Sequence, residues 1–169
     1  MVRSTVSRRA MLAGMTATAV VPGAVRAEAF TDLDWQDLLP EGEVVVPDVL
    51  SGLIDHDSAP MSSQQPVSSG VRTDWNGQII RLPGFILPIE YDGTGVTAFI
   101  LVPYVGACVH VPPPPANQLV FVTTETPYET EGLYEPVNVI GMFGVSSVST
   151  QLAEIGYALS ADRIEPFGM

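Results

Sequence analysis

Residues 106–118 hold the side chains of this chain that are best suited to chemistry. They read Gly-Ala-Cys-Val-His-Val-Pro-Pro-Pro-Pro-Ala-Asn-Gln and contain the only cysteine, Cys108, and one of the two histidines, His110. In an extended segment, side chains two positions apart project from the same face, so the sulfur and the imidazole would stand side by side. The prolines that follow favour a stiff polyproline II segment. The spacing therefore predicts a thiol–imidazole site braced by a rigid segment.

The first chemistry open to this pair is metal binding. Thiolate and imidazole are standard ligands of zinc and copper, so Cys108 and His110 would form half of a transition-metal site. His56 is the third candidate ligand, although it lies between two aspartates in a polar stretch that is typical of a surface loop. Further ligands are sought among Met142 and acidic residues, namely Asp55, Asp57 and Glu90.

Two other functions compete with metal binding. In an enzyme, His110 would lower the pKa of the Cys108 thiol and make it a nucleophile. No third orienting group is evident for that role, and the neighbouring valines and prolines are apolar. In a docking module, the Cys–His pair would be structural, and a partner would contact the proline run with the two amides that follow it: Pro112, Pro113, Pro114, Pro115, Asn117 and Gln118.

The N-terminal residues predict export. Ser7, Arg8 and Arg9 stand directly before an apolar run over 10–21, which resembles a twin-arginine signal peptide. That run is too short to span a bilayer, which takes about 20 residues. A small-residue cleavage pattern places the end of the signal near Ala27 or Ala29. We therefore expect a periplasmic protein with no integral membrane segment, an ordinary secretory signal being the alternative.

The charge of the chain restricts its partners. Beyond Ala27, three arginines face nineteen acidic residues, a net charge of −16, and there is no lysine. Such a chain repels nucleic acid and anionic membranes, so no nucleic-acid partner is expected. The acids either form a solvated surface or attract cations or a basic partner. A lone cysteine in an exported chain cannot form an internal disulfide, so Cys108 is buried, metal-bound, catalytic or paired with another chain.

The hydrophobic pattern divides the mature chain into an arm and a β domain. Residues 28–70 form an N-terminal arm, with one short helix over 31–39 and a polar linker over 55–70. Residues 71–169 alternate as strands do, with a bend at Pro83-Gly84, a hairpin turn over 91–95 and an acidic loop over 125–134. Expected strands cover 79–89, 96–102, 119–123, 136–142 and 156–166, with a helical turn over 150–155.

Five strands with a bent first strand predict a mostly β fold. The best match is a small, partly open barrel of the oligonucleotide/oligosaccharide-binding (OB) type, joined to the irregular arm. A β-sandwich with a copper site is the competing architecture.

The stretch from Trp75 to Val122, with its Gly-Ala-Cys-x-His-x-Pro-Pro-Pro-Pro-x-Asn-Gln hallmark, resembles a family of exported bacterial proteins known only as a domain of unknown function. The resemblance extends over nearly all of the mature chain. It implies a periplasmic setting, in which some relatives accompany membrane transport systems and some are tied to metal supply, but it implies no reaction. The sequence thus predicts a periplasmic accessory protein that binds zinc or copper through Cys108 and His110 and serves a transport or maturation system. A docking module of a membrane transport complex and a Cys–His thiol enzyme are the alternatives.

Overall fold

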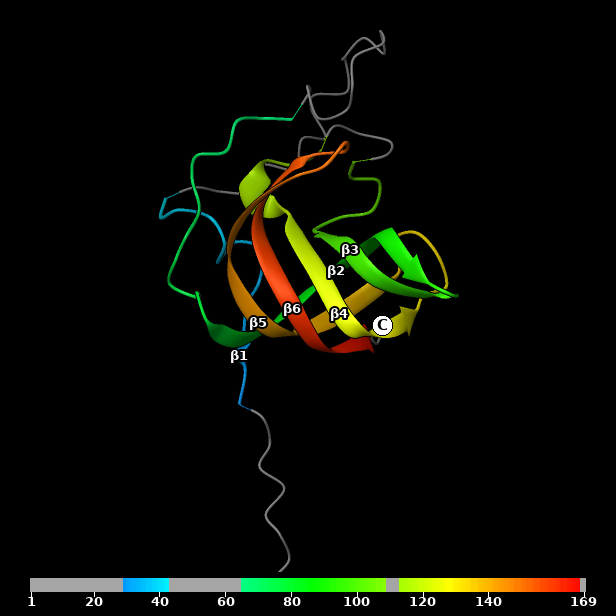
Figure 1. The fold of residues 1–169 in the computed structure, drawn as a ribbon. Helices are drawn as coiled ribbons and strands as arrows, with labels where there is room; N and C mark the ends of the chain where they lie inside the picture. Colours follow the sequence, from blue (N-terminus) through cyan, green and yellow to red (C-terminus); the bar gives the residue numbers. More distant parts are fainter. Residues whose placement is uncertain (1–28, 43–64, 109–112, 168–169) are drawn as a thin grey trace, which may run out of the picture.

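The computed structural model describes residues 29–42, 65–108 and 113–167, and these form a five-stranded mixed β-barrel with one short strand outside it (Figure 1). The predicted mostly β barrel is confirmed. The signal peptide over 1–27 and most of the 55–70 linker lie outside the described residues. The strands are β1 (Thr31–Asp32), β2 (Gln78–Asp92), β3 (Gly95–Val102), β4 (Val120–Glu129), β5 (Pro136–Ser149) and β6 (Glu154–Pro166), and a 3₁₀ turn, η2, spans Ala116–Gln118.

Strand β2 closes the barrel by changing partner along its length. From Gln78 to Phe85 it pairs antiparallel with β5, and from Phe85 onward it pairs with β3. The change falls at the predicted Pro83-Gly84 bend, where a Cβ on Gly84 would lie 2.7 Å from Cγ of Leu101. The strand order is therefore β2-β3-β4-β6-β5 closing on β2, with β4 and β6 parallel.

Alternation along the strands fills the barrel with apolar side chains. Phe143 and Tyr157 stack at its centre with ring centroids 5.1 Å apart. Because successive strand residues point to opposite faces, the same strands also present a second set of side chains outward. The inner cluster includes Ile80, Leu82, Ile86, Val96, Phe99, Leu101, Val120, Val122, Val137, Val139, Phe143, Tyr157 and Leu159.

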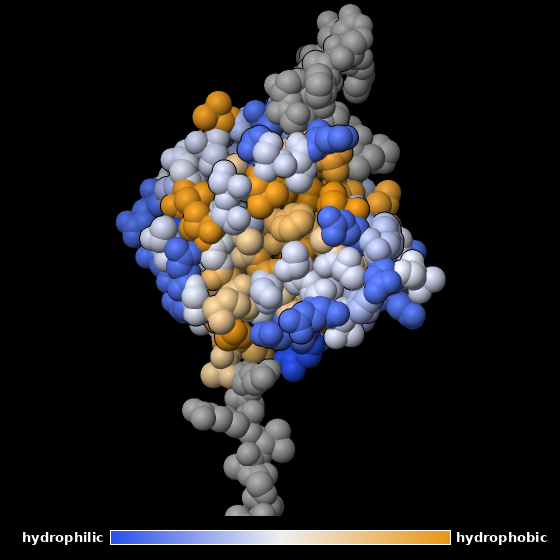
Figure 2. Space-filling view, in the orientation of Figure 1, coloured by the Kyte–Doolittle hydropathy of each residue, from blue (hydrophilic) through white to orange (hydrophobic). Residues whose placement is uncertain are grey.

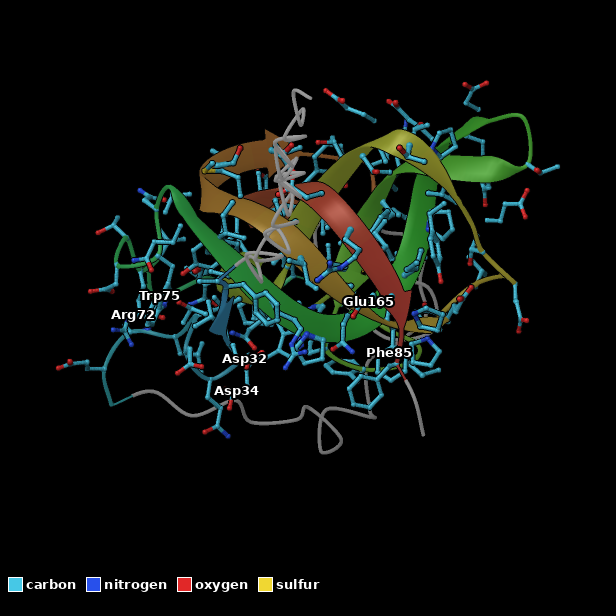
Figure 3. All side chains as sticks on the ribbon, turned by 90° about the horizontal axis from the view of Figure 1, so that it is seen from below. Asp32, Asp34, Arg72, Trp75, Phe85 and Glu165 are labelled. Atoms are coloured by element: carbon cyan, nitrogen blue, oxygen red, sulfur yellow. The ribbon has the colours of Figure 1, made fainter. Side chains whose placement is uncertain are left out.

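The described start of the N-terminal arm, residues 29–42, packs on the barrel, and the helix predicted over 31–39 is wrong. Residues 31–32 instead pair parallel with β2, and a turn follows at 35–38. The Asp34 carboxylate accepts a hydrogen bond from the Gln36 N–H at 2.7 Å, which favours a turn over a helix in so short a segment. Leu38 enters the inner cluster, and its carbonyl accepts a hydrogen bond from the Tyr157 hydroxyl at 2.7 Å. Figure 3 shows Asp32 and Asp34 beside the barrel.

Strands β4 and β5 are much longer than the pattern predicted, because pairing across the barrel overrides local turn signals. The acidic loop predicted over 125–134 begins only after β4 has paired Glu129 with Gly95. β5 continues to Ser149, and a tight turn replaces the helical turn predicted at 150–155. The β4–β6 ladder ends at Thr124↔Ala161, just before two like charges, Glu125 and Asp162. No helix in the described ranges is long and apolar enough to cross a membrane.

The β5–β6 contact supplies a test of barrel closure. A Cβ on Gly141 would collide with the Ser160 carbonyl oxygen and lie 2.8 Å from Cα of Ala161. We expect Gly141→Ala to lower the free energy of unfolding by about 3 kcal/mol, because backbone atoms cannot move aside cheaply.

Gly144→Ala is the matched control on the same strand. Its Cβ would meet only the Asn76 side chain at 3.5 Å, an ordinary contact, so we expect a change within about 0.5 kcal/mol. Urea unfolding midpoints report both values, and equal midpoints for the two variants would contradict the packing described at Gly141.

Candidate functional site

Cys108 lies in a second apolar cluster, on the outside of the barrel. Leu87 of β2 is opposite Ile100 of β3, which is opposite Phe121 of β4, so these side chains share the outer face. The segment between β3 and β4 packs onto this face and brings Cys108 with it. We call its buried members the outer cluster: Leu87, Ile100, Val102, Ala107, Cys108, Leu119, Ala153 and Ile155.

Six half-buried apolar side chains pack against the outer cluster. We call them the outer rim: Phe85, Tyr104, Phe121, Tyr134, Val148 and Leu152. Beside it, Val105 and Leu133 are 62% and 59% exposed. Figure 2 shows apolar residues gathered over the upper ends of β3 and β4, with polar residues around them. Among the described residues, this face of the barrel therefore carries apolar side chains that are only partly covered.

Backbone strain is concentrated at the same place. Among the described residues, the non-glycine positions with positive φ are Cys108 at 65° and Tyr134 at 61°. The Tyr134 hydroxyl donates a hydrogen bond to the Ala107 carbonyl at 2.7 Å, which joins the two strained turns. The assumption that Cys108 lies in an extended strand is therefore wrong, because its backbone turns in the left-handed region. Such strain tends to persist at functional sites, where packing enforces it.

The Cys108 thiol is not activated. It is 1% exposed, and burial raises its pKa to about 12, so it stays protonated at neutral pH. Burial also raises the pKa of Tyr134, with a smaller contribution from Cys108. Within the described ranges, no group of three or more His, Cys, Asp and Glu side chains is placed to hold a metal. Met142 is exposed on β5 and is not part of the outer cluster.

The described part of the proline run is packed against the barrel. Pro113 and Pro114 are buried. The Gln65 side-chain amide donates to the carbonyls of Pro114 and Glu154, each at 2.8 Å, and its oxygen accepts from the Glu154 N–H at 2.7 Å. Gln65 therefore ties the proline segment to the start of β6.

The two amides after the prolines are buried as well. The Asn117 amide donates to the Gly70 carbonyl at 2.9 Å and to Ser69 Oγ at 3.2 Å. The Gln118 amide donates to the carbonyls of Trp35 and Asn117, each at 2.9 Å. Both amides brace η2 against the arm, and their side-chain oxygens are buried without a partner in the structure. They are not on the surface where a docking partner would meet them.

Three of the residues predicted for the site, His56, His110 and Pro112, lie outside the described residues, so their roles stay predictions. Sequence reasoning missed most of the outer rim, whose Tyr104, Tyr134 and Leu152 come from three different loops. One signal pointed to it. Residues 98–102 of β3 contain no polar side chain, which indicates a strand covered on both faces.

Comparison with known proteins agrees with this fold. The family model described as "Protein of unknown function (DUF3299)" matches residues 35–166. A search of curated proteins gave no match. The crystal structure of a DUF3299 family protein from Pseudomonas aeruginosa PAO1 is similar, with 36% sequence identity and a TM-score of 0.71 over 83% of this chain and 98% of that one. This chain belongs to the DUF3299 family.

Proposed function

We propose that this chain is an exported, non-enzymatic accessory protein that binds a partner protein through the outer rim. The observation that carries the proposal is the position of the rim. It lies over β3 and β4 and beside the β5–β6 turn, which correspond to the strands and one of the loops that OB barrels use to bind ligands. Half-exposed aromatic and aliphatic side chains in one patch are typical of protein interaction sites.

The chemistry of the rim favours a protein partner over a nucleic acid or a reaction. The described arginines are each in an ion pair, Arg72 with Asp74, Arg81 with Asp32 and Arg163 with Glu165, and none is a rim residue. Oligonucleotide binding depends on such cations. A protonated, buried thiol does not serve as a nucleophile.

Export to the periplasm is part of the proposal. Its support is the Arg8-Arg9 pair before a short apolar run, followed by the cleavage pattern near Ala27 or Ala29. Twin-arginine export would deliver the barrel already folded, with the outer cluster assembled. The partner then belongs to the same compartment, and a membrane transport complex is the proposed class.

Metal binding by Cys108 and His110 is the second candidate. The observation in its favour is that the chain's only thiol is shielded from solvent two residues before the imidazole, which would protect a soft metal ligand from oxidation. Zinc normally takes four ligands, which the described residues do not supply around Cys108. The other candidate ligands, His56 and His110 among them, lie outside the described residues, so zinc and copper(I) are both retained as candidate metals.

Site-specific photo-crosslinking tests partner binding. A crosslinker placed at Phe121, in the outer rim, should give a defined adduct in cells that produce the protein naturally. The same crosslinker at Met142, which is 48% exposed on the outer face of β5, should give none. Adducts of equal yield at both sites, or none at Phe121, would refute docking at the rim. Fractionation of the same cells tests export, since full-length protein with its Arg8-Arg9 leader confined to the cytoplasm would contradict it.

Elemental analysis separates the two candidates. Protein purified from the periplasm should carry far less than one equivalent of zinc or copper if the thiol is structural. Stoichiometric copper or zinc that is lost in the Cys108→Ser, His110→Ala double variant would establish the metal site instead. The Met142→Leu variant is the control, because Met142 is exposed and outside the outer cluster.

The pH dependence of stability reports the state of Cys108. Its folded pKa of about 12 exceeds the unfolded value of roughly 8.5, so its stabilising contribution is complete below pH 8.5 and is lost as pH rises toward 12. Between pH 7 and pH 10, wild type should lose about 2 kcal/mol more unfolding free energy than Cys108→Ala. Parallel losses in urea unfolding would show that the thiol already ionises in the native state.

A further inference from the structure

We propose that the folded barrel selects which bond behind the leader is hydrolysed, so that a signal peptidase cuts between Ala27 and Glu28 and the mature chain begins at Glu28. This inference rests on the proposed export of a folded protein, and it names the site at which the chain is modified. It follows from how the described start of the arm is held on β2.

Two overlapping patterns of small residues mark candidate cleavage sites. Val25 and Ala27 occupy the third and first positions before the Ala27–Glu28 bond. Ala27 and Ala29 occupy the same positions before the Ala29–Phe30 bond. Hydrolysis of either bond consumes one water and leaves a carboxylate on the leader and an α-ammonium on the mature chain. The sequence pattern therefore does not choose between the two bonds.

Side-chain contacts hold the arm on the barrel from Phe30 onward. The Phe30 ring lies under the Arg81 guanidinium, whose central carbon is 4.8 Å from the ring centroid. Arg81 also forms an ion pair with Asp32. Figure 3 shows Asp32 beside the barrel, on the short strand that pairs with β2. One side chain of β2 thus engages two residues of the arm.

The backbone of the arm is held at the same place. Thr31 and Asp32 form β1, which pairs parallel with Ile80 and Arg81 of β2. The next residue, Leu33, donates its N–H to the Arg81 carbonyl at 3.0 Å, and its side chain is 5% exposed in the inner cluster. Moving Thr31 away from β2 therefore pulls on a residue that is packed inside the barrel.

A peptidase binds its substrate as an extended segment that includes residues on both sides of the bond. A cut before Phe30 would place Phe30 and Thr31 directly after the bond, so both would first have to leave β2. A cut before Glu28 places Glu28 and Ala29 there, and Ala29 is exposed. Loss of the stacking contact and of the strand pairing corresponds to a preference of about thirtyfold for the bond before Glu28.

The selection depends on folding before cleavage. On the proposed twin-arginine route the protein crosses the membrane folded, so the peptidase meets an arm that is already paired with β2. A general secretory route carries the chain unfolded, and both bonds are then equally accessible. The residue at which the mature chain begins therefore records whether the barrel was folded when the leader was removed.

Intact-mass measurement of protein purified from the periplasm tests the inference. Cells that carry the full chain with its own leader should yield protein that begins at Glu28, with less than about a tenth beginning at Phe30. Protein that begins mainly at Phe30 would overturn the inference and leave export standing. Full-length protein confined to the cytoplasm would instead refute the proposed export, so the two failures give different masses.

Exchange of the leader separates the effect of the fold from the sequence preference of the peptidase. With a general secretory leader in place of residues 1–24, both candidate bonds remain in the chain. The share of chains that begin at Phe30 should then rise at least about fivefold, because no folded barrel holds the arm. An unchanged share would mean that the peptidase chooses by sequence alone, and selection by the fold would be wrong.

Matched substitutions locate the effect on β2. Arg81→Ser with Asp32→Ser removes the ion pair and the stacking contact of Phe30, and should raise the share of chains that begin at Phe30 about threefold. Arg163→Ser with Glu165→Ser removes the ion pair of β6, in which the two side chains are 2.8 Å apart, and should leave that share unchanged. Equal shares in the two variants would contradict a role for the contact between Phe30 and Arg81.

Discussion

The exchange of partners by β2 is the constraint on which the rest of the structure depends. Its first half pairs with β5 and its second half with β3, and the missing Cβ of Gly84 lets Leu101 approach at the point of change. A sheet that twists and bends in this way can close on itself, which hides the edges of its strands except at their ends. Closure fixes which side chains point inward. It also fixes which point outward, and the outward set on β3 and β4 is apolar.

A strand that is apolar on both faces must be packed against other side chains on both faces. For β3, the inner cluster covers one face, and the segment carrying Cys108 covers the other. Packing on the outer face requires two residues with strained, left-handed backbone conformations, Cys108 and Tyr134. Their turns are joined by the hydrogen bond from the Tyr134 hydroxyl to the Ala107 carbonyl. The described residues bury the side chains of the outer rim only in part. The family description supplies no function, so the proposed function rests on the outer rim.

Much of the fold could be predicted from alternation, glycine and proline. The β2–β3 hairpin, the bend at Pro83-Gly84 and the mostly β barrel follow from residues close together in the chain, and each is present. The predictions were wrong where residues far apart in the chain determine the secondary structure. The arm forms a turn rather than a helix because the Asp34 carboxylate accepts a hydrogen bond from the Gln36 N–H, while Leu33 and Leu38 enter the barrel. β4 continues to Glu129 because β3 offers it a partner, which a local reading of an acidic stretch cannot detect.

The sequence by itself determined that this is a strongly acidic chain, that its strands form a barrel, and that Cys108 is its only thiol, because these depend on composition and local periodicity. Tertiary structure alone decided that the thiol is buried, and that Asn117 and Gln118 brace the arm. It also decided that Tyr104, Phe121, Tyr134 and Leu152 form one surface. The physical reason is that burial and neighbourhood depend on which strands pair across the barrel, and that pairing joins residues far apart in the chain.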